Sequence, residues 1–414
     1  MLKEAQSKPK QNHIYEASSS ASKKYSSTII ALSAVMFLMN ASFLMIYSLF
    51  PAYLLSLGHS QMNIGFLEGI FEFIAQMLKF GSGFISDILQ KRKLVILAGC
   101  SCVFLGRSMV AFFSHLPYLI FGRSIDRIGN GIYSIPRDTL ITTASSEKTR
   151  AQSLGLVRSL GQIGSVAGAF FASYLMKKAG YGFKDVFQFA IIPTFLILLL
   201  VTFKVKDTPF LQEVNTTKRF KFANLKKLGL KFALLMVVNT IFMLGRSNEA
   251  FMSTYAIKCF NMTNANVPWI MIVFNITWAV CSYPVGILSD KYGRMSVLVA
   301  GITSMLVADM FFFNATSLTT FFIGVVFWGI QMGLTTNAFL TLIADYVEPN
   351  LRGTAIGLYF LINAVCLLTA DTTSGYIADT FGNPYVYLYS AFWAVLSLGA
   401  LMWVRKYRNL AHVS

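Results

Sequence analysis

Charged residues are scarce in this chain. Only 13% of its 414 residues are Asp, Glu, Lys or Arg, while 55% are hydrophobic; soluble proteins average about 25% charged residues. The hydrophobic residues gather in runs of roughly 20 or more, the length that crosses a hydrocarbon core about 30 Å thick. The composition therefore excludes an ordinary soluble domain and predicts a membrane protein.

The chain also lacks the usual signs of metal, redox or nucleotide chemistry. It contains no GxxxxGK[ST] sequence, so no built-in ATP motor is expected. Its five cysteines show no CxxC spacing, and we expect free thiols, four in helices and Cys259 in a short loop. None of its four histidines lies in a predicted helix, so no metal ligand, cofactor or histidine-based enzyme site is expected within the membrane (His13, His59, His115 and His412).

The apolar runs predict an all-α membrane protein with twelve transmembrane helices in two six-helix bundles. The expected domains are a tail over 1–27, a first bundle over 28–203, a basic linker over 204–229, a second bundle over 230–406 and a tail over 407–414. The predicted helices cover 28–56, 62–84, 94–114, 117–145, 151–176, 187–203, 230–257, 267–288, 295–315, 318–345, 353–378 and 384–404.

The placement of the positive charges predicts the orientation. With a cytoplasmic N-terminus, 24 of the 35 Lys and Arg lie in cytoplasmic segments, four lie on the opposite side and seven lie inside helices. This bias follows the positive-inside rule, so both termini are expected in the cytoplasm. The net charge of +17 is thereby explained without nucleic acid as a partner. The polar residues 1–27 precede an apolar run too long for a signal peptide, which indicates an uncleaved first helix.

Short patterns recur at an almost constant offset. Gly-x-x-Ser-Asp occurs at residues 83–87 and 286–290, 203 residues apart, and Thr-Leu-Ile recurs from 139–141 to 341–343. Arg150-x4-Gly155 likewise returns as Arg352-x4-Gly357. The chain therefore contains two copies of one membrane unit. Many secondary transporters have such an internal duplication, and their solute site lies between the repeats near the bilayer midplane.

The repeated pattern resembles the signature G-x-L-[AS]-D-[RK]-x-G-[RK]-[RK] of the major facilitator superfamily. Residues 286–294 fit it closely, whereas the first copy has Ile88 and Gln90 in place of a base and a glycine. The resemblance covers essentially the whole chain and implies alternating access by a monomer, with the motif acting as a gate. In the family, the motif acid meets a helix N-terminus of the other half, here residues 353–354, where the helix dipole favours an acid. The gating residues expected are Gly83, Asp87, Arg92, Gly286, Asp290, Gly293 and Arg294.

A second resemblance covers residues 126–141. This segment is similar to the pattern D-R-x-G-K-G-x-R-x-x-P-R-D-x-L-I of a bacterial subgroup of the superfamily, with Asn130 and Tyr133 replacing Lys and Arg. Some members of the subgroup are linked to siderophore utilisation. The glycine-rich run 161–168 lacks the Gly-Pro of the family's antiporter signature, which weakens the alternative of drug efflux.

The helix predicted over 117–145 carries the densest group of buried charges. On a helical wheel its seven polar residues share an arc of about 120° over about 22 Å. Charges near the bilayer centre are costly, so this face must meet protein partners or water. Three arginines against two acids leave a positive surplus that suits an anionic solute. The alternative is a set of local pairs that brace the bundle. The group comprises Arg123, Asp126, Arg127, Asn130, Ser134, Arg137 and Asp138.

Acids for proton coupling are expected on neighbouring helices. Glu68 and Glu72 share one face of the second helix, and a carboxyl group in an apolar setting can exchange a proton near neutral pH. Alternatively, they only neutralise the arginines, or pair with Lys79. Asp126, Asp138 and Glu249 complete the proton-coupling candidates.

The remaining candidates come from other helices. Arg107 and Arg158 extend the basic lining, and Arg246 is expected to pair with Glu249 on one face of a continuous helix. Trp278 and Trp328, with Gln331, either form an aromatic wall opposite the arginines or belong to the core. Asp309 and Asp371 are either functional or packing groups. The substrate-binding candidates are Arg123, Arg127, Asn130, Arg137, Arg158, Arg246, Trp278 and Gln331.

The sequence thus predicts a secondary transporter in a bacterial cytoplasmic membrane. It would move a small anionic solute, an organic acid or a carboxylate siderophore, by proton-coupled symport. Drug efflux by proton antiport is the alternative within transport. A sensor or an intramembrane enzyme would need a soluble domain or a catalytic group that the sequence does not offer.

Overall fold

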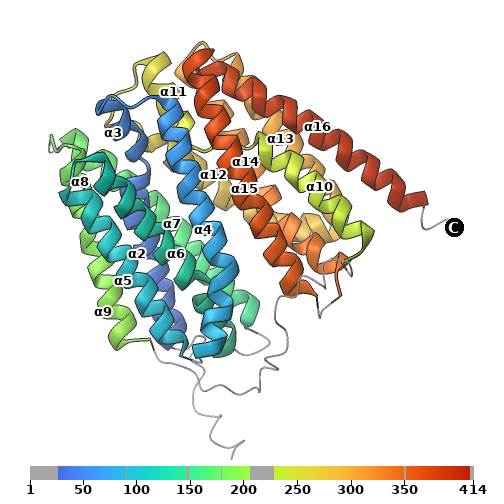
Figure 1. Ribbon diagram of the computed structural model, residues 1–414, viewed down its shortest axis with the longest axis horizontal. Helices are drawn as coiled ribbons and strands as arrows, with labels where there is room; N and C mark the ends of the chain where they lie inside the picture. The colour runs from blue at the N-terminus through green and yellow to red at the C-terminus, as the bar shows by residue number, and fades with distance from the viewer. Residues whose placement is uncertain are drawn as a thin grey trace, which may run out of the picture.

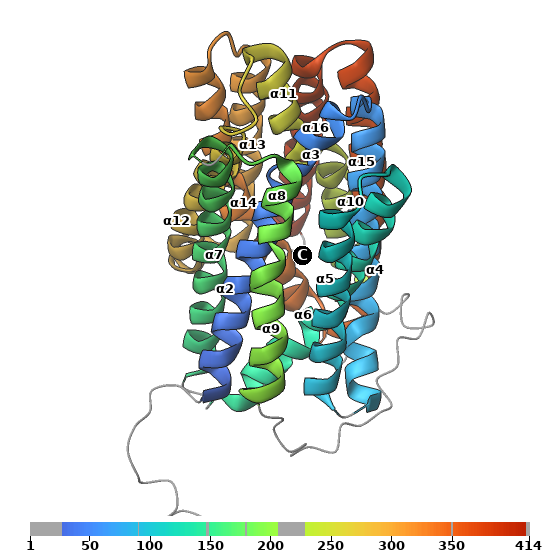
Figure 2. The same cartoon turned by 90° about the vertical axis from the view of Figure 1, so that its left-hand side faces the viewer.

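The computed structural model describes residues 27–89, 91–145, 149–178, 180–205, 228–348 and 351–410. In these ranges the regular structure is helical, and the helices form two bundles that lie side by side (Figure 1 and Figure 2). The first half holds α2 (Ser27–Tyr47), α3 (Phe50–Ser56), α4 (Gln61–Leu89), α5 (Arg92–Phe112), α6 (Leu116–Ala144), α7 (Arg150–Lys178), α8 (Phe183–Phe189) and α9 (Ile191–Phe203). The second holds α10 (Gly229–Gly245), α11 (Ala250–Phe260), α12 (Pro268–Tyr292), α13 (Arg294–Phe313), α14 (Leu318–Tyr346), α15 (Arg352–Thr380) and α16 (Asn383–Leu410).

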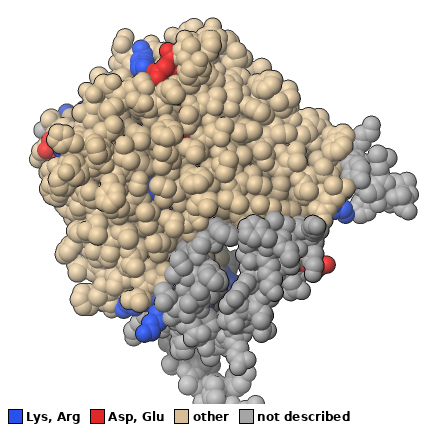
Figure 3. All heavy atoms as spheres, in the orientation of Figure 1, with Lys and Arg blue, Asp and Glu red and all other residues tan. Residues whose placement is uncertain are grey.

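The outer surface fits a membrane. Nine segments of the described residues are long and apolar enough to span one, and Figure 3 shows a broad uncharged face with its charged side chains near the rim. The charge-bearing helices α4 and α6 are not among the nine. Their polar residues face the protein interior, where Glu68, Arg123 and Asp126 are fully or almost fully buried.

Three predicted spans are broken, which corrects the continuous helices expected over 28–56, 187–203 and 230–257. The first span divides into α2 and α3, and the sixth into α8 and α9. Pro51 and Pro193 lie just beyond these breaks, and proline has no N–H for the carbonyl four residues earlier. The seventh span divides at residues 246–249, where the backbone of Arg246 is extended and Asn248 Oδ1 accepts the N–H of Ala250 at 2.9 Å.

The two halves meet mainly at one end of the molecule. We call the end where α9 finishes and α10 begins the linker end, and the opposite end, with residues 57–60, 261–267 and 381–382, the distal end. Near the distal end α4 packs along α15, and α7 along α12. Toward the linker end the halves splay apart in Figure 1. The structure is therefore closed at the distal end.

Close packing and a charged cap form this closure, which we call the distal seam. The carboxylate of Asp379 at the end of α15 accepts the backbone N–H groups of Gln61 at 3.0 Å and Met62 at 2.8 Å, at the start of α4. One turn further on, Gly65 lies so close to the carbonyl of Asp371 that a Cβ atom would overlap it. The seam thus needs both a carboxylate and a glycine.

The predictions for the cysteines and for the helix bounds are confirmed in part. All five cysteines are free thiols, as predicted, but Cys259 lies in the last turn of α11 rather than in a loop. Most helix bounds agree within a few residues, although α4 continues to Leu89 and α16 to Leu410. The tail over 1–26, most of the linker (206–227) and residues 411–414 lie outside the described residues.

Candidate functional site

A cavity of about 400 Å³ lies between the two halves. Its first wall comes from α2, α4, α6 and α7, and its second from the break between α10 and α11, from α12 and from α14. The charged side chains that line it are Glu72, Lys79, Arg127, Arg246 and Glu249. Three bases therefore face two acids.

Behind this wall, α5 and α6 hold a buried ionic cluster. Arg107 Nε donates to Asp126 Oδ1 at 2.9 Å, and Arg123 Nη1 lies 3.4 Å from Asp126 Oδ2. Asn130 Nδ2 also donates to the backbone and side chain of Asp126. Since both carboxylate oxygens are engaged, Asp126 serves as a brace for two arginines. The pairing of Arg123 with Asp126 that the sequence offered as an alternative is present.

Glu68 and Arg123 form the weakest contact of this cluster. Glu68 Oε1 lies 3.7 Å from Arg123 Nη2, and neither oxygen of Glu68 has a hydrogen-bond partner among the described residues. The Arg123 guanidinium instead lies over aromatic rings, 4.9 Å from the centre of Phe50 and 5.5 Å from that of Phe71. Cation–π attraction partly replaces the missing acceptors.

Arg127 lines the cavity and, like Arg123, lies beside a glutamate and over an aromatic ring. Its Nη2 lies 3.4 Å from Glu72 Oε1, and its guanidinium lies 4.8 Å from the centre of the Phe43 ring. Nε and Nη2 make no hydrogen bond in the described part of the chain. Arg127 thus has two buried donors without hydrogen-bond acceptors in the cavity wall, beside the carboxylate of Glu72.

The second half contributes a matching pair at its helix break. Arg246 Nη2 lies 3.4 Å from Glu249 Oε1, as the sequence predicted. The pair stands in the break rather than on a continuous helix face. Across the seam, the Tyr47 hydroxyl lies 2.8 Å from Asn248 Oδ1 and 3.1 Å from Glu249 Oε2. The break therefore joins the cavity charges of the two halves.

The rest of the second wall is largely apolar. Met271, Phe274, Trp278 and Met332 line it, with Asn275 among them. Trp278 occupies the place expected of an aromatic wall, but Trp328 is fully buried and packs with Phe312 in the core of the second half. The cavity consequently has one polar, charged wall and one aromatic and thioether wall.

Other predicted site residues lie away from the cavity lining. Gln331 is fully buried and donates to Thr335. Arg137 pairs with its neighbour Asp138, with Nη2 2.7 Å from Oδ1, and also donates to Tyr133. Arg158 is exposed on α7, four residues before the lining residue Gln162 and so on the same face.

The expected gating residues are only partly described. Gly83 and Asp87 lie in α4, and Gly286 and Asp290 in α12, but the surroundings of these four residues lie outside what the structure describes. Arg92 donates to Thr143 Oγ1 at 3.1 Å. Gly293 has a φ of 83° between α12 and α13, where Arg294 pairs with Asp345. The proposed pairing of Asp87 with residues 353–354 stays a prediction.

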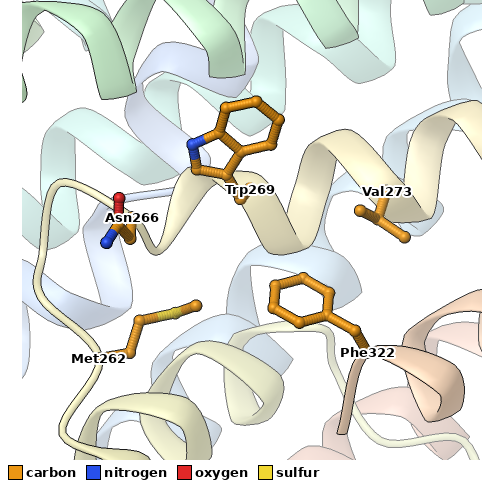
Figure 4. A pocket seen from close by; sticks show the side chains of 5 residues that line it. All are labelled: Met262, Asn266, Trp269, Val273 and Phe322. Atoms are coloured by element: carbon orange, nitrogen blue, oxygen red, sulfur yellow. The ribbon is translucent and has the colours of Figure 1, made fainter. Parts of the chain in front are cut away.

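A second hollow, of about 350 Å³, differs from the cavity in its chemistry. Figure 4 shows its lining, in which Asn266 is the one polar side chain and the others are Met262, Trp269, Val273 and Phe322. All five belong to the second half, near the distal end. Trp269, at the start of α12, fits the interfacial position expected of it. Its lining has no charged group, so it offers no ion pair to an anionic solute.

Several residues of the site were missed at the sequence level. Tyr47 and Phe43 lie in an apolar helix, where nothing marks them as site residues. Asn248 accepts the Ala250 N–H in a break that only Gly245, the last residue of α10, marks in the sequence. The available signal for Tyr47 was the repeat offset, because Tyr47 and Glu249 are 202 residues apart in the chain. Asp379 was missed because its acceptor role depends on the packing of α15 against α4.

The site contains no sign of a metal centre. In the described ranges, no group of three or more His, Cys, Asp or Glu residues is placed to hold an ion. Acidic and basic side chains instead line one cavity between the two helical bundles, at Glu72, Lys79, Arg127, Arg246 and Glu249. A charged cavity between two bundles of membrane-spanning helices is typical of a membrane transporter.

Comparison with known proteins identifies the family. Residues 30–246 and 235–413 match the Major Facilitator Superfamily, and the chain belongs to it. An uncharacterised MFS-type transporter of Methanocaldococcus jannaschii is 28% identical over 385 residues, 91% of this chain and 94% of that protein.

Solved structures agree on the fold. The nucleoside transporter NupG is 14% identical with a TM-score of 0.74, over 92% of this chain and 99% of that one. The human organic anion transporter MFSD10 is 14% identical with a TM-score of 0.67, over 91% and 99%. At these identities the likeness shows the fold alone.

Proposed function

We propose that this transporter moves small organic anions by proton-coupled alternating access. The observation that carries the proposal is the position of Arg127 and Arg246, which line one cavity from opposite halves. An anion between them would be held by both halves at once. Lys79 adds a third positive group to the lining. Because guanidinium groups bind carboxylate and phosphate in bidentate fashion, the pair favours such anions over neutral solutes.

The opposite wall narrows the class of solute. Phe274, Trp278 and two methionines offer apolar and aromatic contact, so the solute would carry an organic body beside its acidic group. The cavity volume of about 400 Å³ lies within the usual range for small-molecule sites, about 300–1,000 Å³. Organic acids and carboxylate siderophores combine these properties. MFSD10, which shares the fold, is an organic anion transporter.

Proton coupling follows from the two cavity carboxylates. Glu72 and Glu249 each lie 3.4 Å from an arginine. A bound anion competes for that arginine, and the displaced carboxylate can then be neutralised by a proton. Solute and proton binding would therefore support each other. Glu68, behind Glu72, is a further proton carrier in this scheme, whereas Asp126 is engaged as a brace and Asp138 lies outside the cavity lining.

We place the linker end in the cytoplasm of a bacterial cell, because the positive-inside bias favours this orientation. The distal closure then corresponds to an inward-facing state. Opening of the distal seam and closing of the linker end would move the cavity to the other side.

Efflux of amphipathic compounds is the second candidate, since the aromatic and thioether wall suits drug-like molecules. It predicts that cations are accepted as well as anions. The three-to-two excess of bases over acids favours the anion.

The test uses purified protein in liposomes and a panel of labelled organic acids, matched neutral analogues and amphipathic cations. We expect counterflow of at least one organic acid, with Arg127→Gln reducing it and Arg127→Lys retaining part of it. Counterflow of cations alone would support efflux instead. Unchanged counterflow in both Arg127→Gln and Asp138→Asn would exclude α6 as the site of binding.

A further inference from the structure

Asp371 lies on α15 where the two halves meet, and the transport scheme above gives it no role. Its side chain is 0% exposed, and its own backbone carbonyl is in close contact with Gly65 of α4. It is therefore buried in the distal seam, beyond the end of the cavity. Opening of the seam would part α4 from α15 at this residue.

The carboxyl group of Asp371 is only half satisfied. Oδ1 accepts the backbone N–H of Asn248 at 2.8 Å, whereas Oδ2 has no hydrogen-bond partner among the described residues. No ion pair to Lys or Arg is formed by Asp371 in that part of the chain. An ionised carboxylate without a cation is strongly disfavoured in such a place, and the neutral form is much less so.

The surrounding titratable groups add to this effect. Glu68 and Glu72 on α4 and Glu249 at the helix break are close enough to repel a negative charge on Asp371. The nearby bases are already engaged, Arg123 with Asp126 and Glu68, Arg127 with Glu72, and Arg246 with Glu249. Tyr47, the titratable group on α2, reaches Asp371 only through Asn248.

A short chain of hydrogen bonds links Asp371 to the cavity. Its Oδ1 holds the backbone of Asn248, whose side chain meets the Tyr47 hydroxyl of the first half. The adjacent residue, Glu249, belongs to the cavity lining. The protonation state of Asp371 thus acts on the segment that carries Glu249 and joins the halves.

We propose that Asp371 is a proton-binding site of the distal seam, which must hold a proton for the seam to close. The proton enters from water on the distal side while the seam is open, and closure buries the neutral acid. Loss of the proton favours reopening. This inference rests on the alternating access proposed above, and it adds a proton site separate from the solute cavity.

The experiment measures closure without any solute, so it does not depend on the solute class. Spin labels at Leu57→Cys and Phe381→Cys report the distance across the distal end, in a chain without its five native cysteines. Both positions are exposed, at 42% and 61%. In liposomes, we expect the short distance to gain population as the pH falls.

Asp371→Asn should remove this response and keep the closed population high at every pH. The amide is isosteric, and its oxygen can still accept the Asn248 N–H. Asp371→Glu keeps an ionisable group and should restore a response, which separates titration from a packing defect.

Asp309→Asn is the matched control. Asp309 is an equally buried acid of the second half that accepts a hydrogen bond from Ser390, within that half. The Asp309→Asn variant should show the same pH response as the parent chain. A parent-like response in Asp371→Asn, or no response in the parent, would overturn the proposal. Failure of all organic-acid counterflow with this response intact would instead reject only the solute class.

Discussion

The hydroxyl of Tyr47 lies 3.1 Å from Glu249 Oε2, and the two residues are 202 positions apart in the chain. This separation equals the offset of two repeated patterns, Thr-Leu-Ile from 139–141 to 341–343 and Arg150 to Arg352. Tyr47 ends α2 and Glu249 precedes α11, so equivalent helix breaks of the two halves meet in the seam. At equivalent positions the first half therefore has a tyrosine and the second half an acid. The hydrogen bond between these two side chains joins the halves.

Removal of the Tyr47 hydroxyl should weaken distal closure. Tyr47→Phe leaves the ring beside Phe43 but deletes a hydrogen bond of about 1 kcal/mol. That loss corresponds to roughly a fivefold shift toward the open seam. The Leu57–Phe381 label pair measures it. Tyr53→Phe, a change within the first half, should have no effect, and an equal shift in both variants would contradict the account.

Loss of the charged cap at Asp379 should have a larger effect. Asp379→Asn keeps one acceptor for Gln61 or Met62 but removes the charge that strengthens both bonds, and hydrogen bonds to charged groups contribute about 1.5–3 kcal/mol. The open population should rise by about tenfold or more in the same distance measurement.

Asp185→Asn supplies the control for Asp379. Asp185 caps the backbone N–H of Gly182 at 2.8 Å within the first half, so the same chemistry is altered away from the seam. An unchanged distance distribution in Asp379→Asn would show that the cap does not hold the seam.

A methyl group at Gly65 should prevent full closure. In Gly65→Ala the new Cβ would overlap the carbonyl of Asp371, and backbone must move to relieve it. We expect a longer distal distance and a strong loss of counterflow. Gly155→Ala, on α7, adds the same methyl group where no atom lies within 4 Å. Its transport should match that of the parent chain, and equal losses in both would argue against a seam effect.

Substitution of Asp126 should lower the stability of the fold more than it impairs proton coupling. Asp126→Asn leaves Arg107 and Arg123 buried without their shared carboxylate, and breaking a buried pair costs about 3–5 kcal/mol. Thermal unfolding in detergent should show a marked loss. A stable Asp126→Asn protein that has lost only its response to a proton gradient would restore Asp126 as a proton carrier.

The sequence predicted the twelve spans, the repeat and the charged face of α6, because long apolar runs and isolated charges are local signals. Pairings such as Arg246–Glu249 were also predictable from spacing. The partners of Asp379 and Tyr47 were not, because each depends on how α4 and α2 dock against the second half. The partner of Asp371 depends on how α15 packs beside the break between α10 and α11, within the second half. Trp328 and Gln331 could not be told from cavity-lining residues by residue type alone. Only packing shows that both are buried away from the lining.

The most direct test of the central claim is uptake of an organic acid into liposomes under an imposed proton gradient. The account predicts accumulation driven by an acidic distal side, and roughly a tenfold to hundredfold loss in Arg127→Gln, the range for one charged hydrogen bond. Arg127→Lys should retain part of the activity. Uptake that ignores the proton gradient, and that is equal in Arg127→Gln and the parent, would contradict both the solute site and its coupling.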